Sequence, residues 1–421
     1  MKIGIQSWGS DGDIRPFAAL AGGLSKAGHN VTLAVTSVDK KDYTALSKSL
    51  NFEIRHLDTS KIENLTNVGK KVLKDVDPLS QLNTIMKTAF DPVYKDIVES
   101  AEMLCEENDI LIGHFLVYPL TILANKNKKP HIAVSTVPFY PSKYTSPIGA
   151  PYLGKLLNSL LWKLGDKIMC KSLLPKINNL RQQEGLIPIK SVLKEGFLST
   201  FLNLAAISPI LSPPSPDLPQ NYSICGFFNI PEHGEKWNMP DSLKEFLKAG
   251  SPPVYITFGS MLSIDSDPEE ITGLLVNAAN IAGCRTIIQS EWNKCKGIPE
   301  YPHIYRITQA PHQYIFPECS VVVHHGGAGT TQSATLHGCP SVVVEHLTDQ
   351  ALWGNALLRA DIGGNLLHRR TVTAQKLANE IKRVLNNAQM KEKAKKLGEI
   401  MKKENGVKSA VEIIEKFCYS S

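Results

Sequence analysis

The amino-acid sequence predicts an α/β protein built from two doubly wound domains with parallel sheets. Short β-rich runs alternate with helix-compatible segments along the chain, and such alternation builds parallel sheets. The alternation occurs in two series, one on each side of the proline-rich segment Ile207–Pro219. A length of 421 residues also suits two domains of about 200 residues better than one ordinary core.

The first part of the chain sets this architecture. Lys2–Ser7 is predicted as a strand, Gly9–Gly12 as a glycine turn and Pro16–Ala27 as a helix with apolar residues on one side. Gly28 follows as a helix C-cap, and Asn30–Thr36 is again rich in β-formers. The result is a strand–helix–strand unit.

Further strands are predicted wherever short apolar runs recur. They are Ile110–Gly113, His131–Thr136, Val254–Phe258, Arg285–Gln289, His303–Arg306, Val321–His324 and Ser341–Val344. Because dense proline breaks helices and interior strands, the proline-rich segment is interpreted as a linker. We therefore predict an N-terminal domain over 1–206, a linker over 207–220, a C-terminal domain over 221–400, and a C-terminal helix over 401–421 that packs back on the first domain.

Composition and charge exclude several classes of protein. Hydrophobic residues make up 43% of the chain and charged residues 20%, which is typical of a globular protein. A net charge of +6 is too small to argue for nucleic acid. The eight cysteines occur without a CxxC pair, which argues for free thiols in a reducing compartment. Because the sequence shows neither a signal peptide nor a long apolar run, we expect a cytoplasmic protein, with peripheral membrane contact as an option.

The segment Val321–Gln350 carries the clearest chemical signal. An apolar strand runs into HHGGAGTT at residues 324–331, and a helix-compatible stretch follows. Glycines let the backbone approach a ligand, and a helix N-terminus presents free N–H groups and a positive dipole end. The threonine hydroxyls can donate hydrogen bonds, and an imidazole can donate a charge-assisted one to a phosphate oxygen. The pattern matches neither the Rossmann dehydrogenase motif nor the P-loop, and it predicts a diphosphate site of another class.

With its surroundings, this loop resembles the donor-site signature of family 1 glycosyltransferases. HHGGAGTT is followed 19 residues after Thr330 by Asp349-Gln350. The preceding QAPH at residues 309–312 resembles the family's nucleotide-base loop, and FGS at residues 258–260 resembles its loop after the first strand of the C-terminal domain. The sequence is most similar to the sterol glucosyltransferases and the bacterial macrolide and glycopeptide glycosyltransferases. This likeness covers nearly the whole chain.

The resemblance implies a GT-B fold, in which two facing Rossmann-like domains enclose an interdomain cleft. It also implies a UDP-sugar donor as co-substrate, with no metal and no other cofactor. By position, Ala310 and His312 hold the uracil and ribose, while Asp349 and Gln350 accept and donate hydrogen bonds to the sugar hydroxyls. The residues implied around the diphosphate are His324, His325, Gly327, Ala328, Gly329, Thr330 and Ser260. Sterol-type members often have serine where this chain has Ala328, so only the backbone N–H remains there.

A second motif, SDGDIRP at residues 10–16, lies where the first strand meets the first helix. Ligands of open α/β sheets bind at the carboxyl ends of the strands, where this turn lies. On the residues alone, Asp13 is equally a helix cap and a catalytic carboxylate. The segment resembles the GSRGDxxP motif of sterol-type enzymes, which implies that Asp13 is the general base and that Ser10 and Asp11 lie by the donor. Asp11 replaces an arginine, and it either weakens binding of the anionic donor or polarises a sugar hydroxyl.

The reaction implied is a direct displacement with inversion at the anomeric carbon. Asp13 takes the proton of the acceptor hydroxyl, while the loop and its helix stabilise the departing UDP. Because a free aspartate, with a pKa of about 3.9, is a weak base toward an alcohol, we expect a partner for it. His114 ends a β-rich run at the place where plant members carry an aspartate paired with their catalytic histidine. We therefore predict a reversed pair, with Asp13 as base and His114 as its orienting partner.

Residues 120–200 are strongly basic, with twelve Lys or Arg against three acids. Within them an amphipathic helix is predicted from apolar residues at helical spacing. These are Leu153, Leu156, Leu157, Leu160, Leu161, Leu164 and Ile168. Either this stripe packs into the core beneath a solvated basic face, or Trp162 on the opposite side is exposed and touches an anionic membrane that holds the acceptor. Phe139, Tyr140 and Tyr144 are candidate walls of an acceptor pocket.

Three functions remain open at this point. The first is transfer of a hexose, glucose from UDP-glucose, to a hydroxyl of a lipophilic acceptor such as a sterol, a macrolide or another natural product. The others are a GT-B nucleotide-sugar epimerase and a non-catalytic partner that binds a nucleotide sugar. Asp13 favours the first, because an inactive partner needs no base. The acceptor and the choice between uridine and thymidine stay open, since acceptor pockets are built from variable loops.

Overall fold

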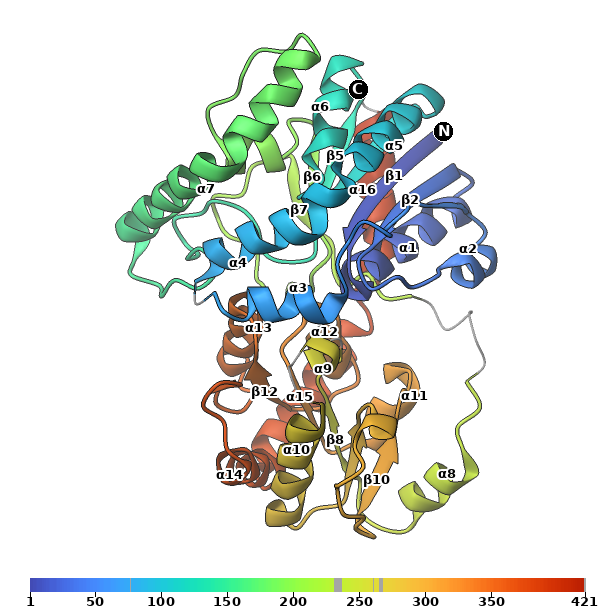
Figure 1. Ribbon diagram of the computed structural model, residues 1–421, viewed down its shortest axis with the longest axis vertical. Helices are drawn as coiled ribbons and strands as arrows, with labels where there is room; N and C mark the ends of the chain where they lie inside the picture. The colour runs from blue at the N-terminus through green and yellow to red at the C-terminus, as the bar shows by residue number, and fades with distance from the viewer. Residues whose placement is uncertain (76, 231–236, 260, 265–267, 420–421) are drawn as a thin grey trace. The chain divides into compact units, whose positions relative to one another are not determined.

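The computed structural model of the chain describes residues 1–75, 77–230, 237–259, 261–264 and 268–419. It divides into two compact units, each with its own parallel sheet (Figure 1). Unit 1 comprises Met1–Glu63, Leu79–Gly234 and Glu404–Ser421, and unit 2 comprises Asn64–Pro78 and Glu235–Lys403. The predicted pair of doubly wound α/β domains is confirmed.

The sheet of unit 1 has the strand order β3-β2-β1-β4-β5-β6-β7, and all neighbours in it are parallel. Its strands are β1 (Lys2–Gly9), β2 (Asn30–Ser37), β3 (Glu53–His56), β4 (Ile110–His114), β5 (His131–Ser135), β6 (Leu202–Ala205) and β7 (Tyr222–Ile224). The central strands β4 and β5 are buried along their whole length, as parallel strands covered on both faces are. The order reverses between β1 and β4, which makes this pair the switch point of the sheet.

Helices cover both faces of that sheet. They are α1 (Asp11–Lys26), α2 (Thr44–Leu50), α4 (Pro78–Ile85), α5 (Tyr94–Glu107), α6 (Tyr118–Lys126), α7 (Lys155–Gln183) and α16 (Gly406–Tyr419). Helix α1 contacts α2 and the C-terminal helix α16, whereas α6 contacts α5 and α7. Phe17 and Leu20 of α1 and Ile414 of α16 are completely buried in the resulting core.

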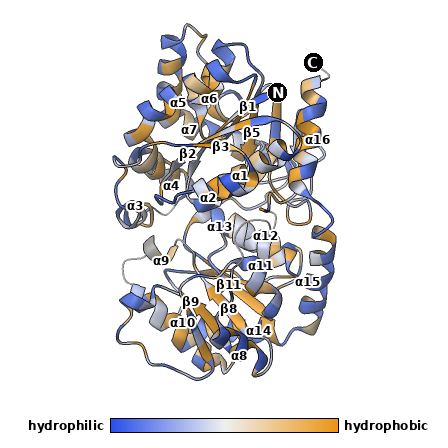
Figure 2. Cartoon of the chain, turned by 90° about the vertical axis from the view of Figure 1, so that its right-hand side faces the viewer, coloured by the Kyte–Doolittle hydropathy of each residue, from blue (hydrophilic) through white to orange (hydrophobic). Residues whose placement is uncertain are grey.

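The sheet of unit 2 has the order β10-β9-β8-β11-β12-β13 and reverses between β8 and β11. Its strands are β8 (Val254–Thr257), β9 (Thr286–Gln289), β10 (Ile304–Ile307), β11 (Val321–His324), β12 (Ser341–Glu345) and β13 (Leu367–His368). Its helices are α3 (Leu65–Val72), α8 (Asp241–Lys248), α9 (Met261–Ile264), α10 (Pro268–Ala282), α11 (His312–Ile315), α12 (Ala328–Leu336), α13 (Thr348–Arg359), α14 (Ala374–Leu385) and α15 (Ala388–Met401). In Figure 2 the strands β8 and β11 are largely apolar, and α15 at the edge is largely hydrophilic.

Helix α1 begins at Asp11, five residues before the predicted start at Pro16. Of the segment predicted as a glycine turn, Gly9 ends β1, Ser10 precedes the helix, and Asp11 and Gly12 are its first residues. Ser10 is the N-cap, with an extended backbone, and the amides of Asp13 and Ile14 bond its carbonyl. Both carboxylates of the motif consequently lie in the first helical turn, where the dipole favours negative charge.

The predicted linker at 207–220 is wrong, because this segment connects two neighbouring strands of the same sheet. It runs from β6 to β7 within unit 1, and Ile207, Ser208 and Leu211 are buried. The Ser208 hydroxyl donates a hydrogen bond to Glu404. The units instead divide between Gly234 and Glu235. Proline density marked an irregular connection, but its buried residues fix it to the core of unit 1.

A second departure concerns residues 64–78, which were assigned to the N-terminal domain and belong to unit 2. Helix α3 in this segment packs on α9, and the Arg370 guanidinium donates to the carbonyl of Leu73. The sequence between β3 and α4 gives no signal of this excursion, because the partners of α3 lie far along the chain.

The contact between Gly226 and Gly406 fixes the start of α16 in unit 1. A Cβ at Gly406 would lie 2.4 Å from the backbone carbon of Gly226, so the two backbones touch. We predict that Gly406→Ala lowers the free energy of unfolding by about 1–3 kcal/mol, because an extra methyl group forces the backbones apart. The measurement is urea unfolding at neutral pH.

Gly165→Ala is the matched control, since a Cβ at this helical position of α7 meets no heavy atom within 4 Å. It should stabilise the protein by about 0.5–1 kcal/mol through helix propensity. Equal stability of Gly406→Ala and the wild type would contradict the close packing.

Candidate functional site

The candidate base lies at the switch point of unit 1. Strand β1 ends at Gly9 beside β4, which ends at His114, and the two strands pair in parallel with Gln6 opposite Gly113. Helices that follow two such strands leave toward opposite faces, so the carboxyl ends of the strands stay open to a ligand. The structure thus brings together Asp13 and His114, which are about a hundred residues apart in the sequence.

The two carboxylate oxygens of Asp13 have different surroundings. Oδ2 accepts hydrogen bonds from the backbone amide of Ser10 at 2.9 Å and from its hydroxyl at 3.1 Å. Oδ1 lies 3.9 Å from Nε2 of His114. A Cβ at Gly9 would lie 2.4 Å from Oδ2, so a glycine with φ of +137° is needed beneath the carboxylate. Asp13 is therefore a helix cap through one oxygen and faces a histidine with the other.

His114 is neutral in this environment. Burial lowers the pKa of His114 to about 3. Its Nδ1 accepts a hydrogen bond from the amide of Leu116 at 3.4 Å, so the single proton of the neutral ring is on Nε2, the nitrogen that faces Asp13. At 3.9 Å the contact between Nε2 and Oδ1 is longer than a hydrogen bond. An N–H donor nevertheless faces a carboxylate acceptor, as an orienting partner requires.

Asp11 has its own partners, and they bear on the two alternatives left open for it. Its Oδ1 accepts from the hydroxyl of Tyr43 at 3.1 Å, and its Oδ2 lies 3.1 Å from Nζ of Lys41. Its amide donates to Asp39. The negative charge that replaces arginine in the motif is thus balanced locally by Lys41. No sequence motif predicts this pairing, because Lys41 follows the next strand, β2.

The second candidate site lies at the switch point of unit 2. Strands β8 and β11 pair with Thr257 opposite His324. Gly259, which follows β8 with φ of +53°, approaches His325 so closely that a Cβ there would lie 3.2 Å from the ring. Ser260, which was predicted to bind the donor, lies outside the described residues.

The predicted diphosphate loop ends at the N-terminus of α12, with Gly327 as N-cap. The first helical hydrogen bond runs from the amide of Thr331 to the carbonyl of Gly327 at 2.9 Å. The amides of Ala328, Gly329 and Thr330 therefore precede the helical ladder and have no partner among the described residues. The Thr331 hydroxyl is buried and donates to Gly327, which leaves the Thr330 hydroxyl as the one available to a ligand.

The two histidines of this loop are buried and neutral, which corrects the expectation of a charge-assisted hydrogen bond in the free protein. Burial lowers the pKa of His325 to about 3 and that of His324 well below its usual value. Nδ1 of His324 accepts from the amide of Gly326 at 3.0 Å, so its proton is on Nε2. That Nε2 and Nδ1 of His325 are buried without a hydrogen-bond partner among the described residues. A buried polar atom without a hydrogen-bond partner destabilises the folded protein, unless a bound ligand supplies that partner.

The predicted sugar-binding residues differ in what they can offer. Gln350 is buried, and its Oε1 accepts from the amides of His346 at 2.8 Å and Leu347 at 3.1 Å. Its carbonyl is therefore occupied in holding the loop at the start of α13, and only its amide nitrogen remains as a donor. Asp349 is exposed. The predicted accepting role thus falls to Asp349.

The predicted base-binding residues lie on the loop between β10 and α11. Ala310 is buried in the core of unit 2, so its side chain packs inward. His312 begins α11, and its ring stacks on Phe316 with centroids 4.3 Å apart. The ring of His312 is thereby held flat against the protein.

The predicted acceptor residues form part of an aromatic cluster in unit 1. Phe139 is buried between Phe115, at 4.8 Å between ring centroids, and Phe197, at 6.0 Å. Tyr140 packs against Tyr222 at 5.2 Å. Nζ of Lys155 lies 4.7 Å from the ring centroid of Tyr144.

The prediction that Trp162 is exposed is wrong. Its side chain is 6% exposed, contacts Phe139, and donates from Nε1 to the carbonyl of Thr145 at 2.8 Å. The alternative, a leucine stripe packed into the core, is also wrong, because most of that stripe is exposed. The helical wheel found two opposite faces correctly but could not tell which one the protein covers.

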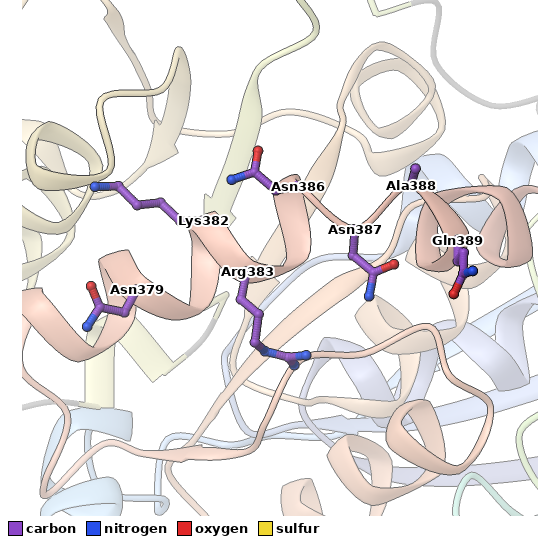
Figure 3. A pocket seen from close by; sticks show the side chains of 7 residues that line it. All are labelled: Asn379, Lys382, Arg383, Asn386, Asn387, Ala388 and Gln389. Atoms are coloured by element: carbon purple, nitrogen blue, oxygen red, sulfur yellow. The ribbon is translucent and has the colours of Figure 1, made fainter.

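Two further polar features escaped the sequence analysis. Glu345, at the end of β12, pairs with His368, and burial raises the pKa of Glu345. The ring of His346 packs edge-on against Phe258 at 4.8 Å, which ties the loop before α13 to the loop after β8. Away from all predicted residues, a hollow of about 620 Å³ lies where α14 meets α15 (Figure 3). It is open to solvent, polar residues and Ala388 line it, and it contains none of the groups discussed above.

Comparison with protein families gives one match. The family described as "Erythromycin biosynthesis protein CIII-like, C-terminal domain" matches residues 275–417. This range includes the diphosphate loop and both candidate sugar residues.

Curated relatives resemble nearly the whole chain. A sterol 3-beta-glucosyltransferase of Komagataella phaffii is 26% identical over 97% of this chain and 34% of its own length. One of Arabidopsis thaliana is 28% identical over 98% of this chain and 64% of its own length. The chain thus spans about a third of the yeast protein and less than two thirds of the plant protein.

Solved structures show the same fold. The glycosyltransferase of kitacinnamycin aligns with a TM-score of 0.72 at 19% identity, over 99% of this chain and 98% of that one. The glycosyltransferase VinC, solved in complex with dTDP, aligns with a TM-score of 0.66 at 18% identity over the whole of both chains. The fold is GT-B. In its motifs, its family match and these relatives, the chain is similar to the family 1 glycosyltransferases.

The buried histidines predict an acid-labile protein. Burial lowers the pKa of His114 and His325 to about 3, and of His131 and His346 to about 4. A histidine in the unfolded chain has a pKa of about 6.5. Below that pH the unfolded chain binds a proton at each of these histidines, whereas the folded chain does not. Stability is therefore fully present above pH 6.5 and is lost as the pH falls toward 4. We expect each such histidine to cost about 1.4 kcal/mol between pH 7.5 and 5.5, measured by urea unfolding.

His131→Leu is the control for this prediction. Neither ring nitrogen of His131 has a hydrogen-bond partner among the described residues, so leucine removes a titrating group and little else. The variant should lose about 1.4 kcal/mol less than the wild type over the same pH interval. An unchanged unfolding midpoint of the wild type from pH 7.5 to 5.5 would show that the histidines are not buried as described.

Substitutions at Gln350 and Asp349 should separate a structural role from a role in sugar recognition. Gln350→Ala leaves two backbone donors without their acceptor, and we predict a loss of about 1–3 kcal/mol in unfolding free energy. Asp349→Ala, at an exposed side chain, should change stability by less than about 0.5 kcal/mol. Calorimetry of Asp349→Ala should show unchanged affinity for UDP and a lost preference for UDP-glucose. Equal weakening of both ligands would remove Asp349 from the sugar site.

Proposed function

We propose that the protein is an inverting glycosyltransferase that moves glucose from UDP-glucose to a hydroxyl of a lipophilic acceptor, without a metal ion. The observation that carries the proposal is the Asp13 carboxylate at the switch point of unit 1, which Ser10 holds through Oδ2 and whose Oδ1 faces Nε2 of the buried His114 at 3.9 Å. A carboxylate kept there only as a helix cap would have no use for a buried histidine facing its second oxygen.

Unit 2 supplies the other half of the proposed chemistry. The amides at the start of α12, the Thr330 hydroxyl and the buried N–H of His324 have no acceptor among the described residues, and a diphosphate provides such acceptors. These donors favour the extra charge that develops on the departing nucleotide, because they are already oriented and partly removed from water.

In the proposed reaction, the acceptor oxygen attacks the anomeric carbon as its proton passes to Oδ1 of Asp13. The bond between that carbon and the β-phosphate oxygen breaks, and UDP leaves with the electron pair. One displacement of this kind inverts the configuration at the anomeric carbon. His114 stays neutral throughout and positions the carboxylate.

The lipophilic acceptor is proposed from two considerations. The relatives are named as sterol glucosyltransferases, and the structural neighbours include a glycosyltransferase of kitacinnamycin. In this chain, the aromatic cluster of Phe115, Phe139 and Phe197 begins next to His114, whose ring lies 4.9 Å from that of Phe115. An aromatic wall beside the base suits an apolar alcohol.

The decisive assay measures UDP release with and without a sterol or another hydrophobic alcohol. A transferase releases UDP in proportion to acceptor and forms a glycoside that mass spectrometry detects. An epimerase converts the sugar nucleotide without acceptor, and a non-catalytic partner binds it unchanged. Proton NMR of the product anomer tests inversion, and activity in the presence of EDTA tests metal independence.

Asp13→Asn is the sharpest variant for this proposal. Asparagine keeps an oxygen for the Ser10 hydrogen bonds but cannot accept the proton. We predict that the variant folds, binds UDP like the wild type, and transfers sugar at least about 100-fold more slowly at saturating substrates. Asp58→Asn, at another aspartate that bonds a nearby serine, is the control and should keep full activity. Turnover of Asp13→Asn within a few-fold of the wild type would refute the role of Asp13 as base.

A further inference from the structure

One side of helix α7, together with Leu153 just before it, presents a row of apolar side chains to solvent. We call Leu153, Leu156, Leu157, Leu160, Leu164 and Ile168 the α7 apolar face. Leu156 is 85% exposed, and the others range from 37% to 57%. The described residues contain twelve exposed large hydrophobic side chains, and six of them lie on this face. Exposed apolar residues scattered singly are ordinary, but a contiguous patch marks an interaction surface.

The orientation of the helix is fixed by polar contacts on its other side. Nε1 of Trp162 donates to the carbonyl of Thr145, and Oδ1 of Asn158 accepts from the amide of Leu153 at 3.2 Å. Asn158 is completely buried, and Trp162 packs against Phe139. Turning the leucines inward would break these bonds and expose the indole. The hydrogen bonds on the buried side therefore determine that the leucine side of this helix faces solvent.

A row of lysines runs along the same side of the helix. Lys163, Lys167 and Lys171 repeat every four residues, as Leu156, Leu160, Leu164 and Ile168 do, so the two rows run side by side. All three lysines are exposed, and none forms an ion pair with a described residue. Farther along α7, by contrast, Lys176 pairs with Asp91.

Acidic groups near this face are scarce. Asp166 is the only acid between Lys155 and Lys176, and its carboxylate accepts from the amide of Leu193 at 3.0 Å on the buried side. The apolar face is thus bordered by positive charge that has no counter-ion in the surrounding described structure. The long helix lies at the periphery of unit 1, drawn in green in Figure 1.

We propose that the α7 apolar face docks on the surface of an anionic lipid bilayer. Leucines at the level of the headgroup and acyl boundary, with lysines reaching lipid phosphates, are the arrangement by which amphipathic helices lie in a membrane interface. A second copy of this chain fits less well. A two-fold contact through this face would set one lysine row near the other, and like charges disfavour that contact.

The docking surface adjoins the aromatic cluster beside the candidate base. On the buried side of α7, Trp162 contacts Phe139 with centroids 6.4 Å apart, Phe139 contacts Phe115, and Phe115 contacts His114. A helix that lies on the bilayer would thus hold this cluster next to the lipid phase. This last step rests on the proposed function, because it supplies a lipophilic acceptor from the membrane. Docking itself requires no activity.

The test is co-sedimentation of the full chain with phosphatidylcholine vesicles, with and without phosphatidylglycerol, in the absence of donor and acceptor. The wild type should bind the anionic vesicles and bind the neutral ones far more weakly. Leu156→Ser with Leu160→Ser and Leu164→Ser should lower the partition coefficient at least about tenfold, because the apolar anchor is lost. Lys163→Gln with Lys167→Gln and Lys171→Gln should lower it to a similar extent, and only on anionic vesicles.

Matched controls lie in unit 2. Ile400→Ser replaces an exposed apolar side chain of α15, and Lys395→Gln with Lys396→Gln and Lys403→Gln replaces three exposed lysines. Both should bind vesicles like the wild type, and thermal unfolding should show that all variants fold.

The proposal is overturned if the wild type stays in solution, or if the leucine variant binds like the wild type. It is also overturned if light scattering shows a dimer that the leucine substitutions dissociate while vesicle binding is absent. Vesicle binding without glycosyl transfer would reject the proposed function and leave the docking surface standing.

Discussion

Both candidate sites depend on one constraint, the pairing of the first strand of each unit with the strand that enters the sheet on its other side. β1 pairs with β4 and β8 with β11, each where the strand order reverses. The register then decides which residues meet. Because Gln6 lies opposite Gly113, the turn after β1 and the end of β4 share one edge. Gly9 at the end of β1 and Gly259 shortly after β8 adopt positive φ, which lets the next residues turn back over that edge.

The sequence was most informative where a signal is local. A strand followed by glycines and a helix predicts its own geometry, and β11 has the bounds expected of it. Proline misled twice. Pro16 was taken as the start of α1, although it lies inside the helix, whose true start is set by the hydrogen bonds between Ser10 and Asp13. The prolines after β6 were taken as a linker, although the apolar residues among them are buried.

What the sequence could not predict is mostly which side of an amphipathic segment the protein covers. Periodicity separates the faces of α7, and hydrophobicity would bury the leucines. The structure instead buries Trp162 and Asn158, because their polar atoms find backbone partners in the preceding loop. Pairings between distant residues are a second such limit. Lys41 opposite Asp11 follows from tertiary positions, and no spacing in the sequence predicts this pair.

Burial of His114 has a consequence for the proposed chemistry of Asp13. A protonated imidazole 3.9 Å from the carboxylate would stabilise its negative charge and so weaken it as a base. Burial keeps the ring neutral, since it lowers the pKa of His114 to about 3. A neutral N–H still orients the carboxylate oxygen but opposes proton uptake much less. For His324 and His325 the effect has the opposite sign, because a bound diphosphate would raise their pKa values and favour the protonated rings. The positive charge would then lie beside the departing nucleotide, whose negative charge increases during the reaction.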